Sequence, residues 1–107
     1  MWAQLIEMRL KPGESTAEMA AGIKAAEQQG SGLVRSLLMH DQSDPSRVFA
    51  LAVFEDEEAA RAREADPSRA EQLEPVRELM ATIFDGPPGF TDLVVDDEWT
   101  GSTAGGS

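Results

Sequence analysis

The chain has 107 residues, 20 of them acidic and 9 basic, so its net charge is −11 and a single domain is expected. This charge, with no basic cluster to offset it, argues against nucleic acids and anionic membrane surfaces as partners. The lack of cysteine excludes disulfides and thiolate chemistry, and because no segment resembles a membrane span or a signal peptide, we expect a cytoplasmic protein.

Residues 2–10 predict the first strand. Side chains alternate between the two faces of a strand, so every second residue from Trp2 to Leu10 shares one face. This face is the more apolar of the two and should meet the helices. Leu5, on the opposite face, is too apolar for a surface that is fully open to water.

The segment after this strand predicts a helix over residues 16–29. Ser15 and Glu18 have the spacing of a capping box, in which each side chain bonds the other residue's backbone amide. The apolar stripe of this helix is thin, because small residues accompany the larger ones. The stripe consists of Met19, Ala20, Gly22, Ile23 and Ala26.

Residues 32–54 predict a long β-hairpin with a polar turn at 41–46. The second strand of this hairpin, residues 47–54, is apolar on both faces. A strand of this kind should be central in its sheet and covered on each side. One face carries Val48, Ala50, Ala52 and Phe54, and the other carries Phe49, Leu51 and Val53.

Residues 55–83 predict helical structure with two interruptions. Acidic residues at its start suit the positive end of a helix dipole. Pro67 should break the helix, Ser68 and Glu71 form a second capping box, and Pro75 indicates a kink or a fresh helix start.

Residues 90–96 predict the last strand. The order is then β-α-β-β-α-β, the split βαβ arrangement of an α+β fold. We expect one domain over residues 1–98 and a flexible tail over residues 99–107, which are rich in glycine, serine and threonine.

Three segments resemble the antibiotic-biosynthesis-monooxygenase-like domains of the dimeric α/β-barrel group. They are residues 9–13 after the first strand, the doubly apolar strand 48–54, and the entry to the next helix at 54–59. The resemblance extends over residues 2–96. It departs from the family pattern at residues 30–33, where Pro-Gly-Phe is common, and at Phe54-Glu55, where Trp-Glu is common.

The resemblance implies a ferredoxin-like sheet in the order 4-1-3-2, with helices on one face and a second subunit on the other. Members include cofactor-free oxygenases of aromatic polyketides and haem-degrading enzymes. The haem-degrading members place an Asn on the first strand and a His on the second helix. Here that strand face offers Ile6 and Met8, and residues 55–84 contain no His, so we expect no haem and no other cofactor.

His40, the only histidine, is a weak candidate for a general base, and a solvated hairpin residue is the simpler interpretation. Trp2 and Trp99 could each stack on a ligand or serve packing. Gln4 could orient a ligand or stay at a wet rim. The acidic clusters fit no metal-binding motif, so no metal site is expected.

The small residues of the helix-facing side leave two alternatives open. Ala50 and Ala52 opposite Ala20, Gly22 and Ala59 could enclose a ligand-sized cavity or allow tight helix-on-sheet packing. The predicted ligand-pocket residues are Trp2, Gln4, Ile6, Met8, Ala50, Ala52 and Phe54. The predicted dimer face is Leu5, Phe49, Leu51 and Val53.

Two functions follow. The first is a cofactor-independent monooxygenase that acts on an aromatic, polyketide-like small molecule bound between sheet and helices. The second is a non-catalytic homodimeric module that binds a small apolar or aromatic ligand or a partner. Both predict a homodimer through the sheet face.

Overall fold

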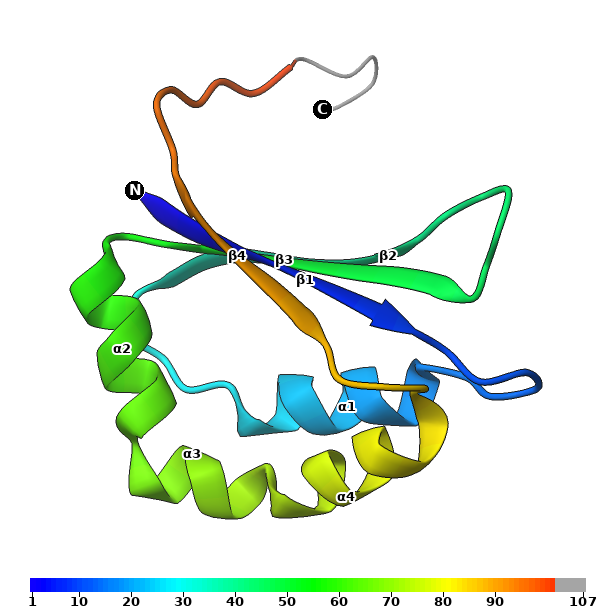
Figure 1. Ribbon diagram of the computed structural model, residues 1–107. Coiled ribbons are helices and arrows are strands. Elements are labelled where there is room, and N and C mark those ends of the chain that lie inside the picture. The colour runs from blue at the N-terminus through cyan, green and yellow to red at the C-terminus, as the bar shows by residue number, and fades with distance from the viewer. Residues whose placement is uncertain (102–107) are drawn as a thin grey trace.

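A computed structural model describes residues 1–101 as one sheet with all its helices on the same side (Figure 1). The strands pair antiparallel in the order β2-β3-β1-β4, which confirms the expected ferredoxin-like order. The elements are β1 (Trp2–Arg9), α1 (Ala17–Ala26), β2 (Leu33–His40), β3 (Arg47–Phe54), α2 (Glu57–Ala65), α3 (Pro67–Gln72), α4 (Glu74–Ile83) and β4 (Gly89–Val94).

The pairing of β1 with β3 decides which side chains meet the helices. Trp2 lies opposite Phe54 at one end of this ladder, and Met8 lies opposite Val48 at the other. All four are buried. Because side chains alternate along a strand, Gln4, Ile6, Ala50 and Ala52 lie on the same side between these two ends.

The two ends of the sheet anchor separate apolar clusters. Trp2 and Phe54 pack with Ala60 of α2. The larger cluster, at the Met8 end, joins the sheet to α1 and α4 through Met8, Met19, Ala26, Val48, Leu73, Val76, Ile83 and Phe84. The helix layer is therefore attached to the sheet most firmly at the two ends of the β1–β3 ladder.

The helical segment after β3 is interrupted before Pro67 and before Pro75, as the sequence predicted. Asp66 caps α3 by accepting a hydrogen bond from the Ser68 amide at 3.0 Å, with Pro67 at the first helical position. Pro75 lies in the first turn of α4, so the prediction of a fresh start there is confirmed.

Both predicted capping boxes are wrong. Ser15 accepts from the Ala17 amide at 3.2 Å, and Thr16 takes the cap position of α1 without a side-chain bond. In the second case the Ser68 amide donates to the side chain of Asp66 and not to that of Glu71. Asp66 is therefore the cap of α3.

Two small residues expected to face β3 pack elsewhere. A Cβ at Gly22 would lie 2.5 Å from Cγ2 of Val76, so Gly22 allows α1 to approach α4 and not the sheet. Ala59 packs against Gly32 of the loop before β2, whose φ of +85° suits glycine. Neither residue encloses the space over Ala50 and Ala52.

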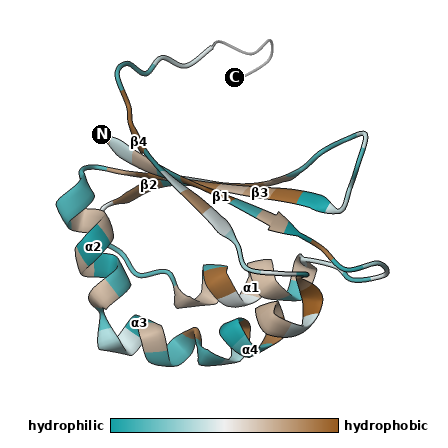
Figure 2. Cartoon of the chain, viewed as in Figure 1, coloured by the Kyte–Doolittle hydropathy of each residue, from teal (hydrophilic) through white to brown (hydrophobic). Residues whose placement is uncertain are grey.

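The other face of the sheet carries no helix (Figure 1). Leu5, Phe49 and Leu51 are half-buried there, whereas Val53 is already buried within the chain and offers little surface. Three further apolar side chains on this face are exposed by about two fifths, namely Leu37, Met39 and Leu93. Figure 2 shows that the strands carry much of the hydrophobic colour, while α2 and α3 are largely hydrophilic.

Beyond β4 the chain runs on without helix or strand as far as Gly101, and Trp99 is 83% exposed. Residues 102–107, the greater part of the predicted tail, lie outside the described residues. Within residues 1–101, no helix has both the length and the hydropathy to cross a membrane.

Substituting Gly22 with Ala tests the close approach of α1 to α4. In an open helix this change stabilises a protein by about 0.5–1 kcal/mol. Here the new methyl group would collide with Val76, whose β-branched side chain has little freedom in a helix. We expect a loss of about 1–2 kcal/mol in the free energy of unfolding, measured by urea denaturation.

The control is a double-mutant cycle with Val76→Ala. Removing Cγ2 should relieve the collision, so the two changes should be less destabilising together than their sum. Additive effects would contradict the contact.

Candidate functional site

Two neighbouring cavities lie between the sheet and the helices. The first has a volume of about 320 Å³ and extends over β2 and β3 beneath α1. The second has a volume of about 300 Å³ and extends over β1 and β3 beside α2, α3 and α4. Five residues line both, which makes the cavities adjoining parts of one region: Ile6, Ile23, Arg63, Met80 and Phe90.

The residues proposed from the sequence as a pocket floor all line one or both cavities. Met8 and Ala50 line the first, Ile6 lines both, and the other four line the second: Trp2, Gln4, Ala52 and Phe54. Of the three small residues expected opposite Ala50 and Ala52, only Ala20 lines a cavity. Ala50 and Ala52 leave space over the middle of β3, while larger residues fill its two ends.

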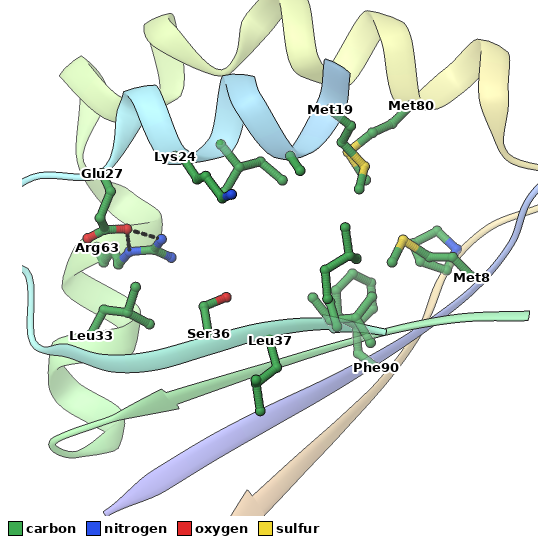
Figure 3. Close-up of a pocket in the computed structure, with 16 residues that line it drawn as sticks. Met8, Met19, Lys24, Glu27, Leu33, Ser36, Leu37, Arg63, Met80 and Phe90 are labelled. Carbon is green, nitrogen blue, oxygen red and sulfur yellow. Dashed lines mark hydrogen bonds and ion pairs between the residues drawn. The ribbon is translucent and has the colours of Figure 1, made fainter. Parts of the chain in front are cut away.

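The first cavity has an apolar end and a charged end (Figure 3). Met8, Met19 and Met80 lie together at the apolar end. The Glu27–Arg63 pair lies at the other, and the Ser36 hydroxyl points into the space between. Lys24 also lines the cavity, between these two ends. The cavity is therefore mainly apolar, with an ion pair at one end and a further cation near its middle.

Glu27, the residue that ends α1, is tied to α2 through Arg63. Nε of Arg63 donates to Oε1 of Glu27 at 3.1 Å, a second nitrogen of the guanidinium bonds the same oxygen, and Ser31 donates to Oε2 at 2.5 Å. Burial raises the pKa of Glu27, but these hydrogen bonds and the charge of Arg63 outweigh it, so the pKa lies below its ordinary value. Glu27 is thus held as a carboxylate and is a poor proton acceptor.

The second cavity contains an aromatic pair with cations over both rings. The Trp2 and Phe54 rings lie 6.1 Å apart at an angle of 47°. The guanidinium of Arg61 lies 5.1 Å from the Trp2 ring centre, and that of Arg63 lies 5.5 Å from the Phe54 ring centre.

Gln4 belongs to a polar chain at the edge of this cavity. Its side-chain amide donates to Oδ1 of Asp92 at 3.1 Å, and Arg61 donates to Oδ2 of Asp92 at 3.2 Å. The Gln4 carbonyl oxygen accepts no hydrogen bond from the described residues. That oxygen can accept from a ligand hydroxyl.

Arginines line the second cavity, and the sequence did not single them out as site residues. Four of the chain's nine basic residues line the second cavity: Arg61, Arg63, Arg69 and Arg77. The available signal was their concentration within residues 61–77 of an otherwise acidic chain. Acidic residues alternate with these arginines along the same helices, so the sequence shows no basic cluster. Only the packing of the helices shows which charged side chains line the cavity.

Other residues singled out from the sequence lie away from the cavities. His40 is exposed at the end of β2, opposite Val48, and lines neither cavity. Trp99 lies beyond β4 and lines neither cavity. Among residues 1–101 no group of three or more His, Cys, Asp or Glu side chains is placed to hold a metal ion.

Comparison with solved structures establishes what this fold is similar to. SnoaB, a cofactor-independent oxygenase from Streptomyces nogalater, superposes with a TM-score of 0.67 at 17% identity, covering 91% of this chain and 94% of that chain. A protein described as an antibiotic biosynthesis monooxygenase gives 0.70 at 13% identity, with 91% and 100% covered. NE2512, a protein of unknown function from Nitrosomonas europaea, gives 0.71 at 18% identity, with 95% of each covered.

The resemblance inferred from the sequence is thereby confirmed at the level of the fold. No protein-family model matches the sequence, and no curated protein matches it. At identities of 13–18% a shared fold does not carry the function with it.

Substituting Glu27 with Gln should destabilise the protein in a pH-dependent way. Because the folded pKa of Glu27 is lowered, its contribution is fully present above the unfolded pKa, about 4.3, and is lost as the pH falls through the folded value. At pH 7 we expect a loss of about 1–2 kcal/mol, modest because the pair is partly solvated. Urea denaturation of both proteins at pH 7 and at pH 3 measures it.

The difference between the two proteins should shrink toward pH 3. The same loss at both pH values would mean that the carboxylate charge is not what stabilises the contact. Glu78→Gln, an exposed change in the middle of α4, controls for the general effect of removing one acid.

Proposed function

We propose that this protein is a cofactor-independent monooxygenase of an electron-rich aromatic small molecule, acting in the cytoplasm as a homodimer. The observation that supports the proposal most is the pair of adjoining apolar cavities between sheet and helices, one of which carries Trp2, Phe54 and several polar groups. A fold similar to that of a cofactor-independent oxygenase adds to it.

In this reaction the substrate itself supplies the electrons. With anthrone, the methylene carbon loses two hydrogens and gains one oxygen atom to form the quinone, and the second oxygen atom leaves as water. The step begins when the substrate loses a proton and becomes an electron-rich anion. A protein can promote this step by stabilising that anion and excluding water.

The second cavity has features that suit this task. Positive charges favour the ionised form of an enol or phenol by lowering its pKa, and four arginines line the cavity against one acidic residue, Glu64. Trp2 and Phe54 line the cavity next to an aromatic substrate, although both are largely buried and a guanidinium lies over each ring. The free carbonyl oxygen of Gln4 can orient a substrate hydroxyl.

The second candidate is a non-catalytic module that binds an aromatic ligand. The shortage of free proton acceptors in the cavities favours it. Within residues 1–101, Glu27 and Glu64 are the only carboxylates lining the two cavities. Glu27 is bonded to Arg63 and Ser31, and Glu64 forms an ion pair with Arg61. His40 lies elsewhere. The substrate would therefore have to lose its proton to water or to Glu64 if the protein is an enzyme.

The proposed dimer uses the helix-free face of the sheet. Its half-buried centre and its three exposed apolar side chains form an apolar patch, and such a patch can pair with the same patch of a second copy. Leu5, Phe49 and Leu51 would lie at the centre of this interface. Val53 would contribute little, since the chain already buries it.

Oxygen uptake tests the enzyme. We expect uptake above the buffer rate with anthrone or a naphthol and no added cofactor. Ala52→Leu should lower kcat/KM about tenfold or more by filling the space over β3. Ala81→Leu is the matched control, because Ala81 is exposed on α4 and lines neither cavity. A wild-type rate equal to the buffer rate would favour the non-catalytic module.

Light scattering at micromolar concentration tests the dimer. Wild-type protein should show twice the mass of one chain, and Leu51→Asp should show the mass of one chain because it places a charge in the interface. Val94→Asp is the control, since Val94 is exposed and pairs with Trp2, on the helix side. A wild-type monomer would contradict the proposed interface.

A further inference from the structure

Arg69 occupies an unusual position among the arginines of the second cavity. It lies on α3 and lines both that cavity and a smaller polar cleft of about 210 Å³ next to it. The cleft is formed by the loop after α1 and the end of α2, and includes Ser31, Arg63 and Asp66. The Arg69 side chain therefore lies where the aromatic cavity meets a polar one.

Arg69 is the one arginine of this cavity that forms no ion pair within residues 1–101. Arg61 pairs with Glu57, Glu64 and Asp92, Arg63 with Glu27, and Arg77 with Glu74. The buried Nε of Arg69 has no hydrogen-bond partner among the described residues. Nε itself is closed off from solvent, so a ligand in the cavity would meet the unpaired charge of Arg69 and not this nitrogen.

The nearby acids do not supply a partner for this charge. Glu27 and Asp66 attract Arg69 through space, but neither accepts a hydrogen bond from it in the described structure. Both oxygens of Glu27 already accept bonds from Arg63 and Ser31, and Asp66 accepts from the Ser68 amide as the cap of α3. The local structure thus uses these acids to hold helices in place.

The surroundings of Arg69 also favour an added negative charge. Burial lowers the pKa of its guanidinium, and the positive charges of Arg63 and Arg77 lower it further. An anion bound here would relieve repulsion among these three cations. Water can solvate the cations but brings no charge to offset them.

The cavity beside Arg69 selects the rest of the ligand. Its lining combines Trp2 and Phe54 with aliphatic side chains such as Leu73 and Val76, and its volume of about 300 Å³ is at the small end for ligand pockets. A ligand that uses both surfaces needs a compact aromatic body and an anionic group at one end. A planar carboxylate can accept two parallel hydrogen bonds from the donor fork of a guanidinium, and it adds little bulk to the ligand.

We propose that Arg69 is the anchor for a carboxylate on the aromatic ligand, so that the substrate class is an aromatic carboxylic acid. The inference rests on the proposed binding of an aromatic molecule between sheet and helices. It adds that this molecule is held at its acidic end by Arg69 at the junction of the two cavities. The reacting ring then lies against Trp2 and Phe54.

Paired ligands test the anchor by binding and not by turnover. The probes are a hydroxynaphthoate and the corresponding naphthol without the carboxylate. The naphthol is neutral at the pH of the assay. Dissociation constants come from quenching of Trp2 fluorescence in a Trp99→Phe background, because Trp99 is the only other indole. We expect the acid to bind about ten- to a hundredfold more tightly than the naphthol.

Substitutions at Arg69 should act on that ratio alone. Arg69→Gln should bring the acid to the affinity of the naphthol while leaving naphthol binding unchanged, and Arg69→Lys should keep part of the preference because it retains the charge without the fork. Lys11→Gln is the control, since it removes one exposed positive charge in the loop after β1. A merely structural role for Arg69 would weaken both ligands together and would contradict the anchor.

The remaining outcomes are also decisive. Equal affinity of wild-type protein for both probes would overturn the carboxylate anchor and leave the aromatic site standing. Binding of neither probe would overturn the anchor together with the proposed function. Tight acid binding without oxygen uptake would support the anchor and assign it to a binding module.

Discussion

The structure depends on how the helix layer is held away from the sheet. Trp2 and Phe54 pack with α2 at one end of the β1–β3 ladder, and Met8 and Val48 pack with α1 and α4 at the other. Between these ends β3 presents only alanines to the helices. Large residues at both ends and methyl groups in the middle leave a space that the chain's own side chains do not fill, and the cavities are the result.

The charge distribution follows from the same arrangement. The chain carries a net charge of −11, yet its cavity region gathers arginines. Arg61 and Arg63 reach acids on other elements and lie over the aromatic rings, so they close the cavity edge as well as charging it. An anion would approach this region against the net charge of the chain, so its binding would depend on the local arginines, of which Arg69 is the one without an ion pair among residues 1–101.

The two faces of β3 have separate roles in the proposed function. One face forms the floor of the cavities through Ala50 and Ala52, and the other offers Phe49 and Leu51 to a second subunit under the proposed dimer. When the substrate supplies the electrons, the protein needs only to bind it in an apolar site and to stabilise its anion by positive charge. A site with few groups able to accept a proton is consistent with this.

The sequence by itself determined the element order, the central place of β3 and the division of its residues between two faces. These follow from local rules, because strand alternation and proline geometry act between near neighbours. Tertiary structure alone decided that Gly22 faces Val76 and not the sheet, and that Arg69 turns toward an aromatic cavity without an acid to pair with. Helices α1, α3 and α4 meet only in the folded chain, so no local pattern records which of their side chains share a space.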